Sequence, residues 1–209
     1  MAQNSGTASG TASGTEGYAE QAAVLLRQYE SITFADAHRV VLHLISPVPC
    51  TVVDIGAGTG RDAAALAAMG HRVVAVEPTA ALRNGAMALH SSSLIEWLDD
   101  SLPDLARLRA RGAVFDLVML TAVWMHLDAV QRRRGMPNVA SLMRARGMMT
   151  MTLRHGPVPM GRRMFEVSAR ETIQLAEAEG LRLVLEVEAP PALQQPGVTW
   201  THLAFTKDR

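Results

Sequence analysis

The feature that most restricts the fold of this chain is the regular alternation of strand and helix patterns after residue 50. Five short runs rich in Val, Ile, Leu and Met predict strands, and the intervening segments carry apolar residues at helical spacing. We place the strands at Thr51–Ile55, Arg72–Glu77, Ser93–Trp97, Val114–Leu120 and Gly147–Leu153, and the helices at Gly60–Met69, Thr79–His90, Leu102–Arg111 and Asp128–Arg144. Continuous apolar strands are typical of a parallel sheet covered by helices on both faces, so the pattern predicts an α/β fold.

The two ends of the chain differ from this central pattern. Residues 1–17 are mostly Gly, Ser, Thr and Ala, which predicts a flexible tail, and two helices are expected over residues 18–30 and 34–45. Near the other end, Ser168 to Glu171 reads as a capping box that begins a helix running to Gly180. Two consecutive strands follow, at residues 181–188 and 199–207, and they should run antiparallel. We expect one domain over residues 18–209, with a helical lid over about 18–46.

Composition narrows the function classes. Hydrophobic residues make up 48% of the 209 residues and the formal net charge is zero, so no global field attracts nucleic acid or an anionic membrane. Lys207 is the sole lysine among 20 basic residues, which points to a GC-rich bacterial genome. One cysteine, Cys50, and the absence of a signal-peptide pattern indicate a cytoplasmic protein. No His, Cys, Asp or Glu cluster has metal-ligand spacing, so no metal is expected.

The glycine-rich turn "GAGTG", residues 56–60, follows the first predicted strand. Gly56 and Gly58 let the backbone approach a ligand closely, Thr59 is expected as an N-cap, and Gly60 allows tight packing where the helix begins. Glu77 ends the second strand and would accept hydrogen bonds from a ribose diol. These features fit a nicotinamide dinucleotide and a nucleoside-type methyl donor almost equally well.

Asp54 distinguishes between these two kinds of ligand. A pyrophosphate brings two negative charges to this turn, and a nearby carboxylate would repel them. S-adenosylmethionine has no phosphate and brings an ammonium and a sulfonium, which an acidic residue tolerates or attracts. The turn therefore favours a ligand with a cationic end.

Five motifs in order resemble those of the class I S-adenosylmethionine-dependent methyltransferases, and the resemblance runs from Tyr18 almost to the C-terminus. They are "VVDIGAGTG", "VVAVEP", "WLDDSLP", "FDLVMLTAVWMHL" and "GMMTMTLRHGP". The resemblance implies a Rossmann-like, seven-stranded mixed sheet in the order 3-2-1-4-5-7-6, with the last strand antiparallel. It also implies S-adenosylmethionine as cofactor and S-adenosylhomocysteine as product.

The resemblance further implies roles for individual residues. Gly56, Ala57 and Gly58 would lie against the methionine part of the cofactor, and Asp54 would hold the loop and the ammonium. Glu77 would bind the ribose hydroxyls with Pro78 beside the adenine. Either Asp99 or Asp100 would accept a hydrogen bond from the adenine amino group, and Thr121 and Ala122 would line the transfer site.

The acceptor side has its own candidates. His126 follows the fourth strand and is either a general base or a residue that shapes the pocket. Arg154 and His155, after the fifth strand, are placed to bind acceptor groups; the arginine would clamp a carboxylate or phosphate, or simply pair with a loop acid. Trp124 would wall the acceptor pocket or fill the core.

The leading helices allow a functional and a structural interpretation, and the arginine run a structural one. Tyr29, Glu30, Phe34 and His38 would belong to a lid over the cofactor, or would pack their helices on the sheet. The run Arg132 to Arg134 is expected to be the solvated face of a helix.

These observations predict methyl transfer from S-adenosylmethionine to an O or N atom of a small-molecule acceptor, by a monomer or homodimer. No nucleic acid or membrane partner is expected. Two alternatives remain open at this point, an NAD(P)-dependent oxidoreductase and a non-catalytic module that binds S-adenosylmethionine.

Overall fold

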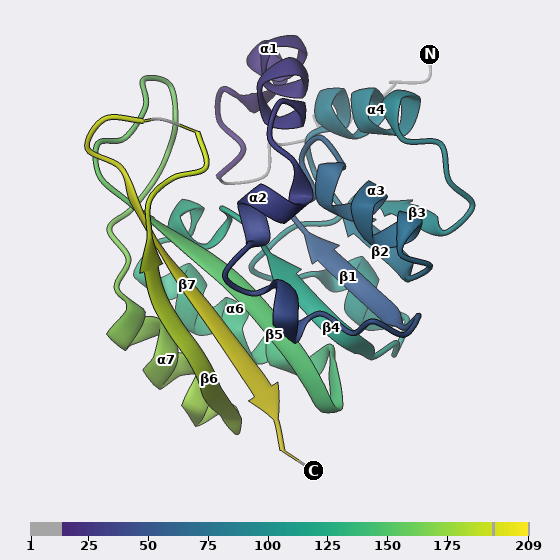
Figure 1. Ribbon diagram of the computed structural model, residues 1–209. Helices are drawn as coiled ribbons and strands as arrows, with labels where there is room; N and C mark the ends of the chain where they lie inside the picture. The colour runs from purple at the N-terminus through teal and green to yellow at the C-terminus, as the bar shows by residue number, and fades with distance from the viewer. Residues whose placement is uncertain (1–13, 194, 209) are drawn as a thin grey trace, which may run out of the picture.

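A seven-stranded sheet forms the centre of the computed structural model, which describes residues 14–193 and 195–208 (Figure 1). The strand order is β3-β2-β1-β4-β5-β7-β6, as predicted. The last strand, β7, pairs antiparallel with both β5 and β6, and the other neighbouring strands pair in parallel. The strands are β1 (Thr51–Ile55), β2 (Arg72–Val76), β3 (Ile95–Leu98), β4 (Phe115–Leu120), β5 (Met143–His155), β6 (Leu181–Ala189) and β7 (Thr199–Lys207).

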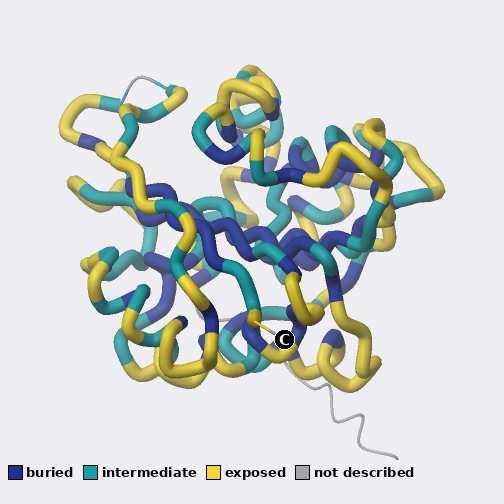
Figure 2. Tube along the Cα trace, turned by 60° about the horizontal axis from the view of Figure 1, so that its bottom comes forward, coloured by how far each residue is buried: buried dark blue, intermediate teal, exposed yellow. Residues whose placement is uncertain are grey.

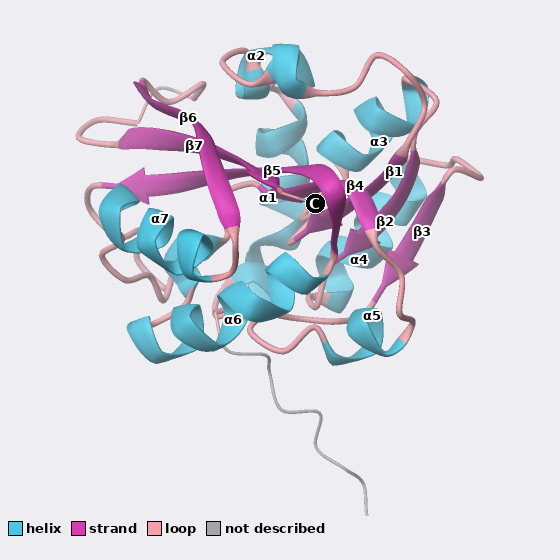
Figure 3. Cartoon of the chain, turned by 90° about the horizontal axis from the view of Figure 1, so that it is seen from below, coloured by secondary structure: helices cyan, strands magenta, loops and turns pink. Residues whose placement is uncertain are grey.

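Seven α-helices and two short 3-10 helices accompany the sheet in the described part of the chain. The helices are α1 (Tyr18–Glu30), α2 (Phe34–His38), α3 (Arg61–Ala68), α4 (Ala80–Leu89), α5 (Ala106–Ala110), α6 (Ala129–Ser141) and α7 (Ala169–Ala178), and the 3-10 helices are Leu42–Leu44 and Trp124–His126. Seen from below, α2 and α3 lie on one face of the sheet and α5, α6 and α7 lie on the other (Figure 3).

The core follows from the alternation of side chains along the buried strands. Val52 of β1 and Leu117 of β4 join an apolar cluster with α2 and α3, whereas Val53 and Val118 point to the opposite cluster, with α5, α6 and α7. Figure 2 shows the strands as the buried centre and the outer sides of the helices as exposed. Burial on both faces explains why these strands read as unbroken apolar runs.

Helix α1 packs against α4 through a small apolar cluster that includes Leu25 and Leu82. Both helices lie above the carboxyl ends of the parallel strands (Figure 1). Residues 14–17, which fall in the segment expected to be a flexible tail, contact the body of the protein: the carbonyl of Glu16 accepts a hydrogen bond from Nη1 of Arg162 at 3.2 Å. The rest of that segment, residues 1–13, lies outside the described residues.

The second leading helix is shorter than predicted. The expectation of one helix over residues 34–45 was wrong, because α2 ends at His38 and a separate 3-10 helix begins at Leu42. His38 is buried and its Nε2 lies 2.7 Å from Oδ2 of Asp62, so the chain is fixed to α3 at this point. Two β-branched residues, Val40 and Val41, then follow, and such residues disfavour continuation of a helix.

Three further elements have bounds that differ from the predicted ones. The helix expected over Leu102–Arg111 is reduced to the five residues of α5. The strand expected from Gly147 begins four residues earlier at Met143, which pairs with Phe115 before the register shifts. Because Met143 joins β5, α6 ends at Ser141 rather than at Arg144.

The arginine run is only partly a solvated face. Arg132 is buried, and its Nη2 lies 2.9 Å from Oε2 of Glu171, while Nη1 donates to the carbonyl of Leu127 at 2.7 Å. Ser168 accepts a hydrogen bond from the amide of Glu171, as expected of a cap, but the Glu171 carboxylate binds Arg132. A charge buried in this way needs such a partner, so the pair joins α6 to α7.

Candidate functional site

A cavity of about 320 Å³ opens at the carboxyl ends of the parallel strands. This is where open α/β sheets bind ligands. It is lined by residues from α1, α2, the loops after β1 to β5, and β7. Twelve of the predicted site residues line it: Tyr29, Asp54, Gly56, Ala57, Gly58, Glu77, Pro78, Asp100, Thr121, Ala122, His126 and Arg154.

The glycine turn is held against the second strand. The amides of Gly56 and Ala57 both donate to the carbonyl of Val76, at 2.8 and 2.9 Å. Gly56 has a φ of 75°, and a Cβ added there would overlap Cγ2 of Val123. The loop after β4 thus lies directly against the loop after β1, a close approach that only glycine permits.

The start of α3 corrects one prediction and confirms another. The N-cap is Gly60, with a φ of 83°, and not Thr59, whose hydroxyl instead donates to Oε1 of Glu30 at 2.6 Å. A Cβ at Gly60 would lie 2.7 Å from Cη2 of Trp97, so this glycine is needed for tight packing, as expected. The Thr59 hydrogen bond fixes the end of α1 beside the turn.

Glu77 is buried and bound by backbone amides on both oxygens. Oε2 accepts from the amide of Gly58 at 2.9 Å, and Oε1 accepts from the amide of Thr79 at 2.7 Å. Burial raises the pKa of Glu77, and these two hydrogen bonds oppose the rise. The carboxyl group is therefore fixed at the junction of the two loops, facing the cavity.

Asp54 adds a qualification to the electrostatic argument made from the sequence. Its side chain is buried, and among the described residues Oδ2 has no hydrogen-bond partner. Burial and the charge of Asp62 raise the pKa of Asp54 well above its usual value, although Arg61 opposes this. The carboxyl group thus retains its proton to higher pH than an exposed aspartate does, and a bound cation would favour its ionised form.

A second acidic group escaped the sequence analysis. Asp62 is the centre of a buried set in which His38 Nε2 and Arg61 Nε each lie 2.7 Å from one of its oxygens. Burial alone would raise the pKa of Asp62, but His38 and Arg61 hold it well below its usual range. His38 is 24 positions away from Asp62 in the sequence, so no local motif signalled the pair.

The two acids after β3 have different positions. Asp100 lines the cavity and accepts hydrogen bonds from the amides of Ser101 and Leu108, at 2.9 and 2.8 Å. Asp99 lies outside the lining, within 3.4 Å of Arg83 Nη2 and 3.8 Å of Arg107 Nη1. Of the two candidates left open, the structure places Asp100 at the cavity.

The loop after β4 forms the middle of the cavity. Ala122 has a φ of 58°, and its amide donates to Oγ1 of Thr152 on β5 at 2.8 Å. Thr121 and Ala122 line the cavity beside the glycine turn, and their role at a transfer site stays a prediction.

His126 forms a pair with Tyr18, which the sequence analysis did not identify as a site residue. Nδ1 of His126 lies 2.8 Å from the carbonyl of Arg163 and must donate to it, so Nε2 is the accepting nitrogen. The Tyr18 hydroxyl lies 3.0 Å from Nε2 and donates to it. Burial lowers the pKa of His126, which keeps the imidazole neutral. The two residues are 108 positions apart, so only the fold brings them together.

Two residues proposed for the acceptor side lie elsewhere, which corrects those assignments. Trp124 is fully buried in the apolar cluster of α5, α6 and α7 and does not line the cavity. His155 also lies outside the lining, and its Nε2 is 2.8 Å from Oγ1 of Thr201. Arg154 lines the cavity, and its Nη1 donates to the carbonyl of Pro157 at 2.9 Å.

Several residues complete the lining without having been predicted from the sequence. They are Gly14, Tyr18, Thr152, Arg162, Met164 and His202, and all but Thr152 come from segments outside the five motifs. In the part of the chain that the structure describes, no group of three His, Cys, Asp or Glu side chains is placed to hold a metal ion. Within residues 14–193 and 195–208, no helix is both long and apolar enough to span a membrane.

Comparisons with known proteins agree with this geometry. A family model described as a methyltransferase domain matches residues 52–147. The TehB-like S-adenosylmethionine-dependent methyltransferase of Corynebacterium glutamicum is similar, with 21% identity, a TM-score of 0.69, and coverage of 91% of this chain and 98% of that one. A comparison with curated proteins found no match.

Two further solved structures have the same fold. The 1,6-didemethyltoxoflavin-N1-methyltransferase of Burkholderia thailandensis, solved with S-adenosylhomocysteine, has 21% identity and a TM-score of 0.67, over 91% of this chain and 90% of that one. The N-methyltransferase NodS of Bradyrhizobium japonicum, also with S-adenosylhomocysteine, has 17% identity and a TM-score of 0.69, over 91% and 98%. With the sheet order, these findings show that residues 52–147 match a methyltransferase domain and that the chain has the fold of S-adenosylmethionine-dependent methyltransferases.

Proposed function

We propose that this chain transfers a methyl group from S-adenosylmethionine to an O or N atom of a small-molecule acceptor in the cavity described above. The observation that carries the proposal is the convergence of the glycine turn, Asp54 and Glu77 on one cavity, within the matched methyltransferase domain. The cofactor supplies an activated methyl group on a sulfonium and leaves as S-adenosylhomocysteine.

The residues of the chain fit this cofactor. Asp54 has a buried oxygen without a partner, which suits an approaching cation. The Glu77 carboxylate is aimed by two backbone amides and retains lone pairs for the two hydroxyls of a ribose. Gly56 and Gly58 leave the turn free of side chains, and Asp100 lies at the adenine end implied by the resemblance.

Catalysis by this site would rest mainly on alignment. Methyl transfer is an in-line displacement, and holding two reactants in line contributes up to about 7–11 kcal/mol in favourable cases. Thr121 and Ala122 line the position between the glycine turn and the acceptor side and would limit the orientations of the acceptor.

Proton removal would involve both Tyr18 and His126. Because Nε2 of His126 already accepts from the Tyr18 hydroxyl, the proton lost by the acceptor passes to the Tyr18 oxygen while Tyr18 gives its own proton to Nε2. The Arg163 carbonyl bonded to Nδ1 stabilises the resulting imidazolium. His126 would then act as a base through Tyr18 rather than by direct contact.

A small acceptor, a monomer or homodimer and a cytoplasmic location remain part of this proposal. Two similar structures, those from Burkholderia thailandensis and Bradyrhizobium japonicum, are named as N-methyltransferases, which supports a nitrogen acceptor. The residues of α1 and α2 that line the cavity, such as Tyr29, support the expected lid over residues 18–46.

The test is a screen with the purified protein, S-adenosylmethionine and fractionated bacterial metabolites, with release of S-adenosylhomocysteine as the signal. We expect one or a few fractions to support turnover and to contain a product heavier by one methyl group. If S-adenosylhomocysteine binds but no fraction supports turnover, the chain is a non-catalytic binding module instead.

A further inference from the structure

The charged residues around the cavity are divided by sign. We define the cofactor half as the lining residues within 54–62 and 76–102, and the acceptor half as the lining residues within 121–202. The cofactor half contains four carboxyl groups and one arginine: Asp54, Asp62, Glu77, Asp100 and Arg61. Among the described residues, the charged side chains of the acceptor half are Arg154 and Arg162, and no carboxyl group lines it.

The leading segment adds one residue of each sign at the rim. Asp36 and Arg39 both line the cavity from α2 and the turn after it, and both are exposed. The Asp36 carboxylate already accepts from the Thr33 hydroxyl at 2.6 Å. This pair therefore does not alter the division in the buried part of the cavity.

Arg154 is half-buried, and no described carboxylate is within ion-pair distance of it. Its hydrogen bonds, both through Nη1, go to the carbonyls of Gly156 and Pro157, at 3.5 and 2.9 Å. Burial lowers its pKa, and the nearby titratable groups that oppose this are Tyr18 and Tyr29. A guanidinium remains charged at neutral pH, so Arg154 presents an uncompensated cation to the cavity.

Arg162 has the same character. Its Nη2 donates to Oε1 of Gln21 at 2.7 Å, its Nη1 donates to the carbonyl of Glu16, and its guanidinium lies 3.8 Å from the centre of the Tyr18 ring. All of these partners are neutral groups. The contrast with its neighbour is direct, because Arg163 pairs with the carboxylates of Glu16 and Asp128, at 3.9 and 3.5 Å.

A neutral polar group accompanies the two arginines. His202 on β7 lies opposite Thr152 of β5, lines the cavity, and has no described partner for its buried Nδ1. The pKa of His202 is lowered to about 4, mainly by burial and further by the charges of His38 and Arg39. The ring is therefore neutral at physiological pH. It leaves a nitrogen available to a hydrogen-bonding group on the acceptor.

From this division we infer that the methyl acceptor carries an oxyanion, a carboxylate or a phosphate, which Arg154 and Arg162 bind in the acceptor half. The inference rests on the proposed function and specifies its substrate class. A guanidinium matches the planar, two-oxygen geometry of such groups. The acids of the cofactor half would repel the same anion, so each of the two substrates is directed to its own half.

The test uses the full chain saturated with S-adenosylhomocysteine, and small probes titrated by calorimetry or NMR. Benzoate and phenyl phosphate carry the two oxyanions, and benzamide is the neutral match for benzoate. We expect at least one anion to bind the complex about 10-fold or more tightly than benzamide. The anion that binds with the higher affinity shows whether a carboxylate or a phosphate is preferred.

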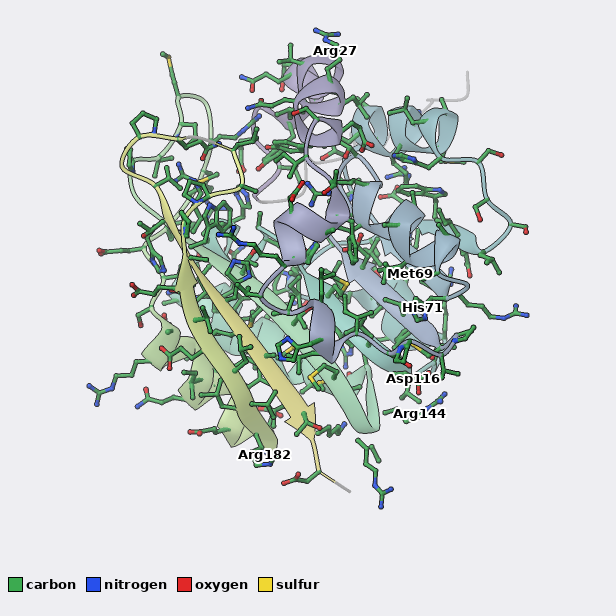
Figure 4. All side chains as sticks on the ribbon, in the orientation of Figure 1. Arg27, Met69, His71, Asp116, Arg144 and Arg182 are labelled. Atoms are coloured by element: carbon green, nitrogen blue, oxygen red, sulfur yellow. The ribbon has the colours of Figure 1, made fainter. Side chains whose placement is uncertain are left out.

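Two variants test whether Arg154 itself, rather than the overall charge of the protein, binds the anion. Arg154→Met keeps most of the side-chain volume and should weaken anion binding about 10-fold while changing the affinity for S-adenosylhomocysteine less than about 2-fold. Arg27→Met is the control, because Arg27 is exposed at the far end of α1 and points away from the body of the protein (Figure 4). It should leave both affinities unchanged.

The outcomes distinguish this inference from the proposed function. Equal affinity for benzoate and benzamide, absence of anion binding, or equal loss in Arg154→Met and Arg27→Met overturns the inference while binding of S-adenosylhomocysteine is retained. If S-adenosylhomocysteine itself does not bind the unmodified protein, the proposed function fails first.

Discussion

The two halves of the cavity hold their functional groups by different means. In the cofactor half, Glu77 and Asp100 accept hydrogen bonds from the backbone amides of Gly58 and Leu108, at 2.9 and 2.8 Å, and so are held from the segments at the ends of the parallel strands. In the acceptor half, Arg154 is held by carbonyls of the loop after β5, and Arg162 is held by Glu16 and Gln21 of the leading segment.

We expect this difference to separate cofactor binding, which depends on the shared sheet, from acceptor choice, which can vary. Groups fixed by backbone amides at strand ends depend on the sheet, which the whole family shares. Groups fixed by the loop after β5 and by the leading segment can be replaced without changing the sheet. We therefore expect binding of S-adenosylhomocysteine to depend on the cofactor half and acceptor preference to depend on the other.

The strongest test of this comparison is Glu77→Ala. It removes the ribose-binding carboxylate and leaves the amides of Gly58 and Thr79 without their acceptor, so affinity for S-adenosylhomocysteine should fall about 100-fold, or about 2.7 kcal/mol. His126→Ala, in the acceptor half, should change it less than about 3-fold. Calorimetric titration measures both. If neither substitution affects binding, the cofactor half has been misplaced.

Where the two halves touch, we expect a difference in stability between two glycine substitutions. Gly56→Ala and Gly180→Ala both place a side chain at a φ near 75°, which costs about 1–2 kcal/mol. Only at Gly56 does the new Cβ meet another residue, Val123, which adds about 1–3 kcal/mol of overpacking. Urea unfolding should show the larger loss for Gly56→Ala, whereas equal losses would mean that the loops are not in close contact.

The acceptor half should show its own dependence on pH. The pKa of His202 is lowered from 6.5 to about 4 in the folded chain, so the unfolded chain takes up a proton first as the pH falls. The stability that the neutral ring contributes is complete above pH 6.5 and is lost between pH 6.5 and about 4. Unfolding of the unmodified protein and of His202→Gln should therefore diverge over this window by on the order of 1–2 kcal/mol. A difference that is constant with pH would contradict the assignment.

The smallest effect concerns the Tyr18–His126 pair. Tyr18→Phe removes the hydroxyl that donates to Nε2 and favours the neutral imidazole, so the pKa of His126 should rise by less than about one unit. Affinity for S-adenosylhomocysteine should be unchanged, because Glu77 and the glycine turn are intact. NMR titration of the His126 ring measures the shift, and an unaltered pKa would show that the hydroxyl does not bind Nε2.

The sequence predicted the features that lie within short segments. The strands, the glycine turn and Glu77 are encoded by apolar runs and by turn residues at strand ends, whereas the order of the strands in the sheet was implied by the resemblance to the methyltransferase family. The Tyr18–His126 and His38–Asp62 pairs join residues 108 and 24 positions apart, and no local pattern marks them.

Predictions failed where a tertiary contact overrode a local preference. Thr59 is a good N-cap by type, but its hydroxyl binds Glu30 of α1 and Gly60 takes the cap position. Arg132 looks like part of a solvated run, yet Glu171 of α7 draws it into the interior. For Trp124 the sequence left two interpretations open, a wall of the acceptor pocket or a core residue. Its full burial in the apolar cluster behind the cavity shows that it is a core residue.

The most direct test of the account is a pair of calorimetric titrations of the unmodified protein, one with S-adenosylhomocysteine and one with NADH. Asp54 at the glycine turn favours a ligand with a cationic end, which would stabilise its ionised form, and disfavours a diphosphate. We predict saturable binding of S-adenosylhomocysteine and no heat of binding from NADH. Binding of NADH without binding of S-adenosylhomocysteine would contradict the account.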